Sequence, residues 1–167
     1  TVNYTCSEIP QPTWTPNPAN AHQYAAVDCG TWTQCEAQAV ALGAHLVTIN
    51  DAAEQQWIRS TFVTNYYWTG LTDRDIEGTW KWISGDTSAY SNWSTLPIAQ
   101  PDNFQGNQNY AYFGGSNTGS DGKWDDVNEA NTLLNARTYG IFEKSSGITA
   151  TISASSTAPV AGTAVTF

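Results

Sequence analysis

The 167-residue sequence contains no methionine and few basic residues, and the second shortage limits what the chain can bind. Six Lys and Arg stand against fifteen Asp and Glu, which gives a formal net charge of -9 at pH 7. Nucleic acids and anionic membrane surfaces require clustered cationic side chains, so neither is expected as a partner. Cations are the more natural partners of this chain. The absence of methionine fits an exported protein.

Long apolar runs are also absent. No stretch approaches the roughly 18 apolar residues of a membrane-spanning helix, and the first ten residues have no basic head followed by an apolar run. We therefore expect a soluble segment. Because the sequence stops abruptly at "GTAVTF", we interpret it as a piece of a longer protein.

Only three cysteines occur, Cys6, Cys29 and Cys35, which allows one disulfide and leaves one thiol over. No CxxC spacing suggests a zinc site or a redox dithiol. Cys29 comes just before a predicted helix cap and Cys35 lies about one turn into the helix, so we favour this pair. Pairing of Cys6 with another chain stays open.

The first third of the chain predicts an extended start, a strand and two helices. Prolines dominate residues 1–21, an extended lead-in with little regular structure, and "HQYAAVD" (22–28) is typical of a strand. Thr31 and Gln34 have capping-box spacing and Gly43 supplies a stop. The apolar face of this first helix consists of Trp32, Cys35, Ala39 and Val40.

A second helix is predicted to follow a short strand in "HLVTI". Asp51 and Glu54 have the spacing of a second capping box. The apolar side chains Trp57, Ile58 and Phe62 fall on one face of this helix.

Beyond about residue 66 the helical periodicity disappears. Short β-rich runs separated by turn residues replace it: "YYWTGLTD", "GTWKWISG", "YAYFGG", "GKWDD" and "TYGIFEK". Two helices before a mostly antiparallel set of strands indicate an α+β domain. The segment from about 84 to 109 has few strand signals, and such long loops are more often functional than idle.

The chain divides into a lead-in (1–21), one domain (22–146) and a tail (147–167). The tail is rich in Ser, Thr, Ala, Gly and Val. It is expected to be a linker or the first strand of a following module, and it resembles the opening of immunoglobulin-like repeats of bacterial surface proteins.

Oxygen-bearing side chains gather in three segments: "LTDRDIEG", "QPDNFQGNQN" and "KWDD". Calcium takes six to eight oxygen ligands from carboxylates, amide carbonyls and water. Spacing alone does not join the three segments.

The order of these segments is similar to that of a C-type lectin domain. "YWTGLTDRDIEGTWKW", "YSNW", "QPD" and "KWDD" followed by "YGIFEK" resemble its successive landmarks, and "TWTQCEAQAVALGAHLVTI" resembles its first helix and strand. The resemblance covers roughly residues 22–144. It implies a double-looped α+β fold whose long loop carries calcium, and it places this chain near bacterial members of the family, since most of the family's disulfides are missing and Tyr110 occupies one such cysteine position.

The resemblance also implies two calcium sites. The principal site maps to Gln100, Asp102, Gln108, Asp125 and Asp126, and the accessory site to Asp73, Glu77, Asn103 and Asn109. Two departures occur in the principal site, where Gln108 replaces the usual Glu and Asp125 replaces the usual Asn. Because these changes cancel in charge, calcium is still expected, with weaker binding below about pH 5.

The motif Gln100-Pro101-Asp102 resembles the galactose-type version. Exchanging acid and amide reverses the donors and acceptors offered to two neighbouring sugar hydroxyls. The implied sugar contacts are Gln100, Asp102, Gln108 and Asp125, with Phe104 as a platform for the apolar face of the sugar. The resemblance also implies a cis peptide bond before Pro101.

Plainer interpretations stand beside these. The acids and amides can be solvated turn residues, Asp73 and Glu77 can form a surface turn with Arg74, and Phe104 can pin the loop to the domain. Core positions are the expected places for Trp68, Trp80, Trp82 and Trp93. His45 is expected to be a packed strand or loop residue, and His22 and His45 are isolated in the sequence.

The leading hypothesis is calcium-dependent binding of galactose-type glycans by a non-catalytic adhesion module outside the cell. The alternative is a protein-binding or ice-binding domain of the same fold, with calcium structural or absent. An enzyme is the weakest hypothesis, because no nucleophile, base and orienting group can be picked out and no Gly-rich phosphate loop occurs.

Overall fold

The computed structural model describes residues 11–115, 121–129 and 139–145, which form the expected α+β fold. Two helices accompany one sheet with the strand order β1-β2-β8-β4-β6-β7, to which β3 is added through β8 and β5 through β4. The elements are β1 (Thr15–Pro16), β2 (His22–Asp28), α1 (Trp32–Ala41), β3 (His45–Leu46), α2 (Ala52–Thr61), β4 (Tyr66–Thr72), β5 (Lys81–Trp82), the 3₁₀ helix η1 (Phe104–Gly106), β6 (Tyr110–Gly114), β7 (Asp125–Val127) and β8 (Tyr139–Ser145).

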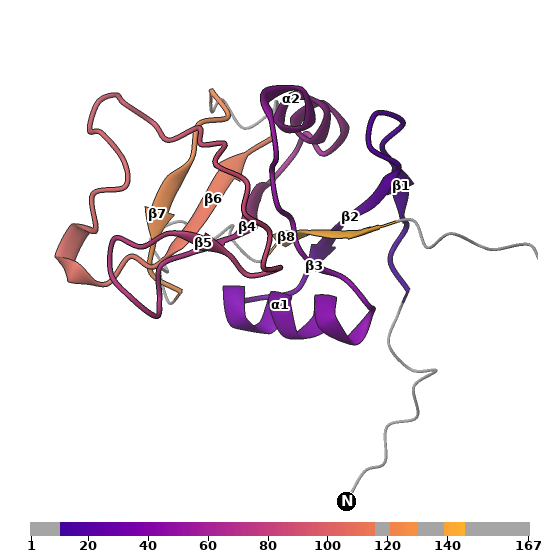
Figure 1. Cartoon of the computed structure of the whole chain (residues 1–167), viewed down its shortest axis with the longest axis horizontal. Coiled ribbons are helices and arrows are strands. Elements are labelled where there is room, and N and C mark those ends of the chain that lie inside the picture. The colour runs from indigo at the N-terminus through magenta and orange to yellow at the C-terminus, as the bar shows by residue number, and fades with distance from the viewer. Residues whose placement is uncertain (1–10, 116–120, 130–138, 146–167) are drawn as a thin grey trace, which may run out of the picture.

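The sheet is antiparallel except where β4 runs parallel to β8. Strands β2 and β8 pair along their whole lengths, from His22 opposite Ser145 to Asp28 opposite Tyr139. Figure 1 shows β1 and β2 at one end of the molecule and η1 with the long loop at the other. The chain ends of the domain and its longest loop are therefore well separated.

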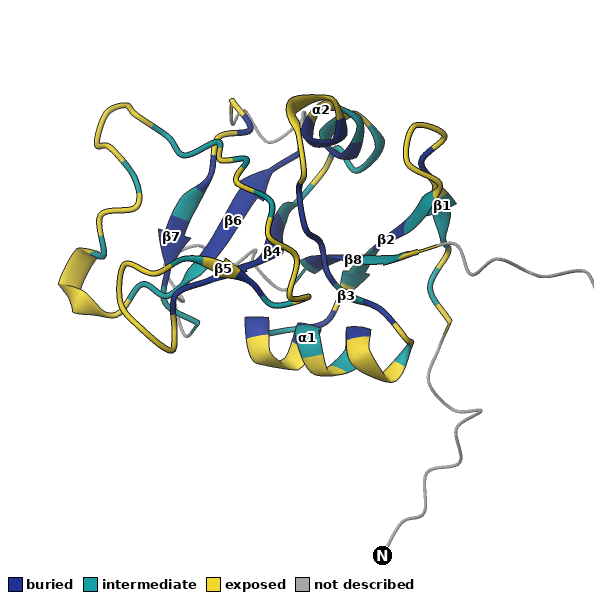
Figure 2. Ribbon diagram, in the orientation of Figure 1, coloured by how far each residue is buried: buried dark blue, intermediate teal, exposed yellow. Residues whose placement is uncertain are grey.

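Helix α1 forms as its sequence predicts. Thr31 and Gln34 make a reciprocal capping box, and the N–H of Gly43, at φ +70°, donates to the carbonyl of Val40. Trp32, Cys35 and Ala39 are buried, whereas the outer face is exposed (Figure 2). The placement of Val40 on the apolar face is wrong, since this side chain is 53% exposed.

The favoured disulfide is present. Cys29 and Cys35 are joined, with Cα atoms 4.8 Å apart, so the bridge ties the end of β2 to the first turns of α1. Cys6 lies outside the described residues.

Helix α2 begins at the predicted cap but without a capping box. The Asp51 side chain accepts from the Glu54 N–H at 2.8 Å, and Glu54 turns inward instead of returning the bond to Asp51. Its carboxylate accepts from the Asn50 N–H at 2.7 Å and from the Tyr24 hydroxyl. The capping-box prediction fails here because Glu54 is recruited into the core, with 5% of its surface exposed.

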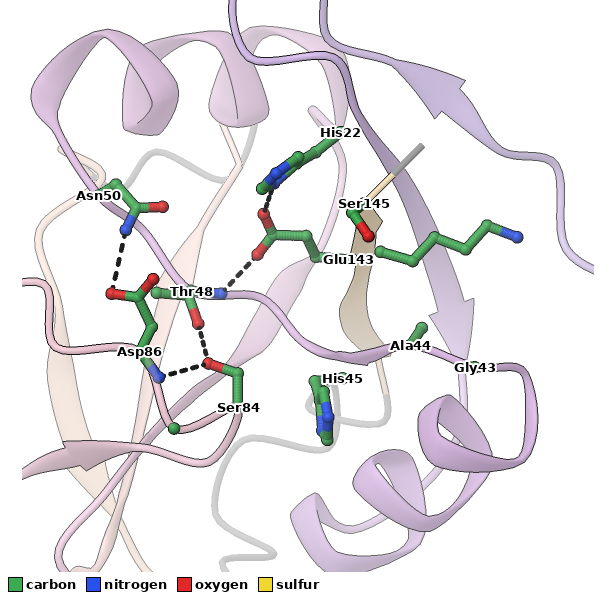
Figure 3. Close-up of a pocket in the computed structure, with 12 residues that line it drawn as sticks. His22, Gly43, Ala44, His45, Thr48, Asn50, Ser84, Asp86, Glu143 and Ser145 are labelled. Atoms are coloured by element: carbon green, nitrogen blue, oxygen red, sulfur yellow. Dashed lines mark hydrogen bonds and ion pairs between the residues drawn. The ribbon is translucent and has the colours of Figure 1, made fainter. Parts of the chain in front are cut away.

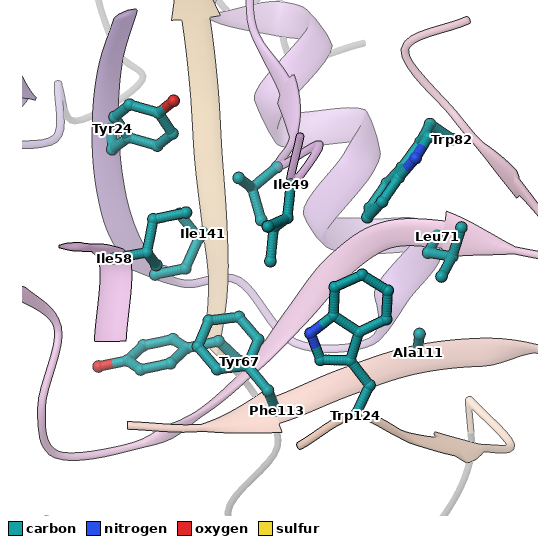
Figure 4. Packing of buried hydrophobic residues seen from close by; sticks show 11 residues of the cluster. Tyr24, Ile49, Ile58, Tyr67, Leu71, Trp82, Ala111, Phe113, Trp124 and Ile141 are labelled. Atoms are coloured by element: carbon teal, nitrogen blue, oxygen red, sulfur yellow. The ribbon is translucent and has the colours of Figure 1, made fainter. Parts of the chain in front are cut away.

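Two apolar clusters hold the sheet and helices together. The first, drawn in Figure 4, surrounds Ile49, Tyr67 and Trp124, and the second surrounds Trp32, Leu46 and Phe142 beneath α1. Trp68 and Trp82 are buried core residues, while Trp80 and Trp93 are half-buried against the first cluster. The core prediction for the four tryptophans is therefore confirmed for two and partial for the other two.

Several strands are shorter than their sequence patterns. Only His45 and Leu46 of "HLVTI" join the ladder, and "GTWKWISG" contributes only β5. The described part of the lead-in pairs with β2 through β1, and Asn17 there is buried. The tail 147–167 lies outside the described residues. Between β5 and β6 the segment contains only η1 and a single bridge from Trp93 to Trp124, so the long loop is as expected.

Candidate metal and sugar site

The candidate site begins with the loop around Pro101, whose preceding peptide bond is cis as expected. The Gln100 side-chain oxygen accepts from the Asp102 N–H at 3.0 Å, and Asp102 Oδ1 accepts from the Phe104 N–H at 3.2 Å. Asn103 and Gln105 adopt positive φ values of 44° and 64°. Such conformations are costly for residues other than glycine and gather at functional loops.

Strand β7 meets this loop through Asp126. Its Oδ1 accepts from the Asp102 N–H at 3.0 Å and its Oδ2 from the Asn103 N–H at 2.9 Å. The carboxylate is buried, with 1% of the residue exposed. Residues 24 positions apart are thereby held together, which spacing in the sequence could not reveal.

The far side of the loop closes on the same residues. The Gln108 N–H donates to the Asn103 side-chain oxygen at 3.0 Å, and the Phe104 N–H donates to the Gln108 side-chain oxygen. The Asn109 carbonyl accepts from the Thr72 hydroxyl at 2.7 Å and from the Asp73 N–H at 3.3 Å. Gln108 and Asn109 thus join the loop to the end of β4.

Asp125 is placed differently from the other predicted ligands. Successive side chains of a strand point to opposite faces, so Asp125 and Asp126 diverge. Asp125 Oδ2 accepts from the Tyr112 hydroxyl of β6 at 2.6 Å, whereas Asp126 holds the loop. Gln100, Asp102, Gln108 and Asp126 are therefore connected in the described structure, and Asp125 is adjacent to them in the chain.

Asp73 and Glu77 stand beside this cluster. Asp73 Oδ2 accepts from the Gly78 N–H at 2.8 Å, while its Oδ1 is buried without a hydrogen-bond partner in the described part of the chain. Glu77 is exposed and lies close enough to Asp73 and Asp126 for their charges to act on it. The same segment forms a surface turn, because the Ile76 N–H donates to the Asp73 carbonyl at 3.0 Å and Arg74 approaches Asp75 at 3.7 Å, so the surface-turn alternative stays open.

Burial and neighbouring negative charges disfavour the ionised forms of two acids in the cluster. Burial raises the pKa of Asp126, although the backbone N–H groups of Asn103 and Asp102 oppose this, and the charge of Asp102 raises it further. Partial desolvation raises the pKa of Glu77 first, and the negative charges of Asp73 and Asp126 add to it. Like charges gathered without a cation favour uptake of protons or of a metal ion.

The residues fit a hard cation with oxygen ligands. Among the described residues no group of three His, Cys, Asp or Glu has the geometry of a metal site, so a cation here depends on amide oxygens as well. The unpartnered buried oxygen of Asp73 supplies the observation in favour, because a buried charged oxygen without a partner is costly. Carboxylate and amide oxygens are the ligands that calcium prefers.

Phe104 is 63% exposed, which argues against the idea that it pins the loop to the domain. Its ring makes no aromatic contact with another described residue. An exposed ring next to the loop oxygens is available to a ligand.

Sequence reasoning missed two hydroxyl groups that position the site. Tyr112 fixes Asp125, and Thr72 fixes the carbonyl of Asn109. The signal for Tyr112 is its register, since it pairs directly with Asp125 across β6 and β7. Thr72 carried no such signal, because its role depends on a loop that returns 37 residues later.

A separate cavity of about 380 Å³ lies away from the loop and contains both histidines (Figure 3). His22 Nδ1 lies 2.6 Å from Glu143, and the hydroxyls of Thr48 and Ser84 are 2.7 Å apart. His45, which is half-exposed in β3, pairs with Glu36 instead of packing. These polar groups satisfy one another, so we assign this cavity no ligand.

Comparison with known proteins agrees with the fold. The sequence model of the family described as Lectin C-type domain matches residues 29–134. Asialoglycoprotein receptor 2 of Mus musculus is 39% identical over 99 residues, which cover 58% of this chain and 31% of the relative. C-type lectin domain family 10 member A of Homo sapiens is 35% identical over 101 residues, covering 58% and 29%. The chain thus spans about a third of the length of these mammalian relatives, and the expected likeness to bacterial surface proteins stays a prediction.

Solved structures show the same fold. The mouse scavenger receptor C-type lectin carbohydrate-recognition domain matches with a TM-score of 0.65 and 28% identity, over 79% of this chain and 93% of that one. A calcium-independent type II antifreeze protein matches with a TM-score of 0.65 and 22% identity, over 79% and 91%. The second likeness shows the fold alone. No described helix is long and apolar enough to cross a membrane.

Proposed function

The chain belongs to the C-type lectin domain family, and on that premise we propose that it is a calcium-dependent carbohydrate-binding module with galactose-type preference. It is non-catalytic in this proposal. The module acts in adhesion or recognition outside the cell, as one part of a larger protein, and its partners are glycans that carry galactose or a related sugar.

The observation that carries the proposal is the convergence of three distant segments on Asp126. This buried carboxylate binds the backbone of Asp102 and Asn103, and its charge reaches Glu77 beyond β4. A loop that is held by buried acids, one of which has an unpartnered oxygen, is better suited to a cation than to bulk water.

We assign the metal ligands as the residues that the family resemblance implies. The principal set is Gln100, Asp102, Gln108, Asp125 and Asp126, and the accessory set is Asp73, Glu77, Asn103 and Asn109. A bound calcium ion supplies coordination for two neighbouring sugar hydroxyls. Asp125 joins this set only by releasing Tyr112 or by sharing its carboxylate with that hydroxyl.

The loop side chains orient the sugar. In the assigned contact set, Asp102 and Asp125 accept from sugar hydroxyls, and the amides of Gln100 and Gln108 donate to them. The order of amide and acid around Pro101 selects the hydroxyl pair, which is the basis for the galactose preference. Phe104 provides a ring for the apolar face of the sugar and is exposed enough to do so.

Affinity for a single sugar is expected to be weak, with a dissociation constant of about 1 mM. Repetition of the module or of its ligand would raise the effective affinity. This fits a module that works beside other domains of a longer chain.

The decisive experiment measures binding to a glycan array in calcium and in EDTA. Binding of terminal galactosides that disappears in EDTA and in Asp102→Asn supports the proposal. Asp28→Asn is the matched control, because Asp28 is exposed at the end of β2 and its substitution removes the same charge. Absence of glycan binding in saturating calcium would contradict the proposal, and turnover of galactosides would contradict its non-catalytic part.

The second candidate is a protein-binding or ice-binding domain with structural calcium or none. The amides at Asn103, Gln108 and Asn109 favour it, because each amide replaces a possible carboxylate ligand and lowers the charge available to calcium. Thermal hysteresis in the presence of EDTA, without glycan binding, would select this function.

A further inference from the structure

We propose a second carbohydrate subsite, independent of calcium, in the cleft between β5 and the segment that follows it. The cleft has a volume of about 380 Å³. That value is at the lower end of the range for small-molecule sites. Its walls include Trp80, Trp82, Asp86, Ala89, Tyr90 and Trp93. The occupant we assign is one pyranose ring of a neutral glycan.

Two tryptophans form a corner in this cleft. The rings of Trp80 and Trp93 have centroids 4.8 Å apart and an interplanar angle of 65°, and both residues are half-buried. One ring can therefore lie beneath a sugar while the other stands at its edge. The apolar face of a pyranose, with its C–H groups, suits such an aromatic surface.

Hydrogen-bonding groups in the cleft remain available. The indole N–H of Trp82 is used, because it donates to the Ser88 carbonyl at 3.2 Å. The indole N–H groups of Trp80 and Trp93 make no hydrogen bond within the described residues, and neither is among the buried unsatisfied atoms. Either donor can therefore bond to a ligand that enters beside the two rings.

An acceptor stands at the rim. Asp86 is exposed, and its Oδ1 accepts from the Ser88 N–H at 2.6 Å and from the Asn50 side chain at 3.3 Å. Its Oδ2 is unused in the described part of the chain. An apolar surface with a few hydrogen-bond donors and acceptors beside it is the combination that a sugar ring requires.

The Trp93 wall of the corner is anchored to the domain core. Trp93 bridges to Trp124, with rings 5.8 Å apart, and the Ser94 N–H donates to the Trp124 carbonyl at 2.8 Å. The Trp124 N–H in turn donates to the Asn92 carbonyl at 2.8 Å. A preformed surface spares a ligand the entropy of ordering the site.

None of the assigned metal ligands lines the cleft. The inference goes beyond the proposed function and relies on it only for the choice of galactoside probes. The two proposals can therefore fail separately.

The test is indole N–H NMR of the ¹⁵N-labelled protein in EDTA, titrated with methyl β-D-galactoside and with lactose. Trp80 and Trp93 are assigned with Trp80→Phe and Trp93→Phe. We expect saturable shifts of these two signals at millimolar sugar, unchanged in Asp102→Asn. Trp80→Ala should lower the affinity about fivefold or more.

A second variant guards against loss of folding. Ala89→Leu fills the mouth of the cleft without removing an aromatic ring, and Ala52→Leu, on the exposed first turn of α2, is its matched control. Loss of the shifts in Ala89→Leu alone supports the subsite. Shifts that require calcium and persist in Ala89→Leu would overturn the subsite and leave the calcium site standing. Absence of saturable shifts of Trp80 and Trp93 in EDTA would also overturn the subsite, and the glycan array would still test the calcium site separately.

Discussion

The α2 end of the molecule and the loop after β4 each bury a carboxylate, and they treat it in opposite ways. Glu54 accepts from the Tyr24 hydroxyl, the Asn20 amide and the Asn50 N–H, so both of its oxygens are used. Asp73 is more deeply buried, at 1% exposed against 5%, yet only its Oδ2 has a hydrogen-bond partner in the described structure.

From this difference we infer that Glu54 is a structural acid and that Asp73 is a candidate metal ligand. Burial raises the pKa of Glu54, and hydrogen bonds from three donors within the chain offset part of the free-energy cost of burying its charge. The charges of Asp73 and Asp126 both act on Glu77, and the nearby cations Arg74 and Lys81 pair with Asp75 in the described structure. An acid that the fold leaves unsatisfied indicates a ligand from outside.

The largest effect is expected from breaking the satisfied acid. Glu54→Leu removes the acceptor of the Asn50 N–H and of the Asn20 amide and leaves the Tyr24 hydroxyl only Glu143, which should cost about 3 kcal/mol of unfolding free energy. Urea unfolding measures it. None of the hydrogen-bond partners of Glu54 is a candidate metal ligand, so the loss of stability should be equal in calcium and in EDTA. A loss of unfolding free energy seen only in calcium would mean that Glu54, like Asp73, contributes to calcium binding, and would contradict the distinction between the two acids.

The next effect comes from the unsatisfied acid. Asp73→Asn should weaken calcium binding about tenfold or more, because a ligand charge is removed. In EDTA the unfolding free energy should stay the same or rise, since an unpaired buried charge disappears. Isothermal titration and thermal unfolding measure the two quantities.

The exposed Asp75, which pairs with Lys81, provides the control in Asp75→Asn. Equal weakening of calcium binding by both variants would mean that general surface charge, and not the Asp73 oxygen, attracts the ion.

The same contrast explains what the sequence could predict. Apolar periodicity and the Thr31 cap predicted α1, and short β-rich runs predicted β2, β4, β6 and β8, because these elements depend on local pattern and burial. The burial of Val40 and the capping role of Glu54 were predicted wrongly for one reason. Helical periodicity gives the direction of a side chain but not which neighbour will lie there.

The site was predictable only in part. The family resemblance supplied the residue types and the cis bond before Pro101, whereas the grip of Asp126 on Asp102 depends on the tertiary fold. The divergence of Asp125 towards Tyr112 follows from strand alternation, but only once the register of β7 against β6 is known. Long-range register is the information that a single sequence holds least clearly.

A pH series sharpens the comparison with a smaller effect. The pKa values of Asp126 and Glu77 are raised, chiefly by desolvation, so without calcium these groups favour folding below their ordinary pKa values. That contribution is lost as the pH rises through the raised values. Calcium requires the ionised groups, so its stabilising effect should grow from pH 4.5 to pH 7.

Thermal unfolding at both pH values, in calcium and in EDTA, measures this change. The pKa of Glu54 is also raised, but its contribution is common to both conditions and cancels in the difference. A calcium effect of equal size at the two pH values would show that the buried acids do not bind the ion.

Substitution of Phe104 should have the smallest effect, and it separates a loss of sugar binding from a loss of stability within the loop region. At 63% exposed, the ring contributes little packing, so Phe104→Ala should leave the unfolding free energy unchanged. If the ring stacks on a sugar, galactoside affinity should fall about fivefold, which corresponds to roughly 1 kcal/mol. Leu96→Ala is the matched control, because Leu96 is 80% exposed and precedes the motif. A fall in stability with unchanged affinity would mean that Phe104, like Glu54, has a structural role. Equal losses of affinity in Phe104→Ala and Leu96→Ala would indicate a general apolar contact with the probe.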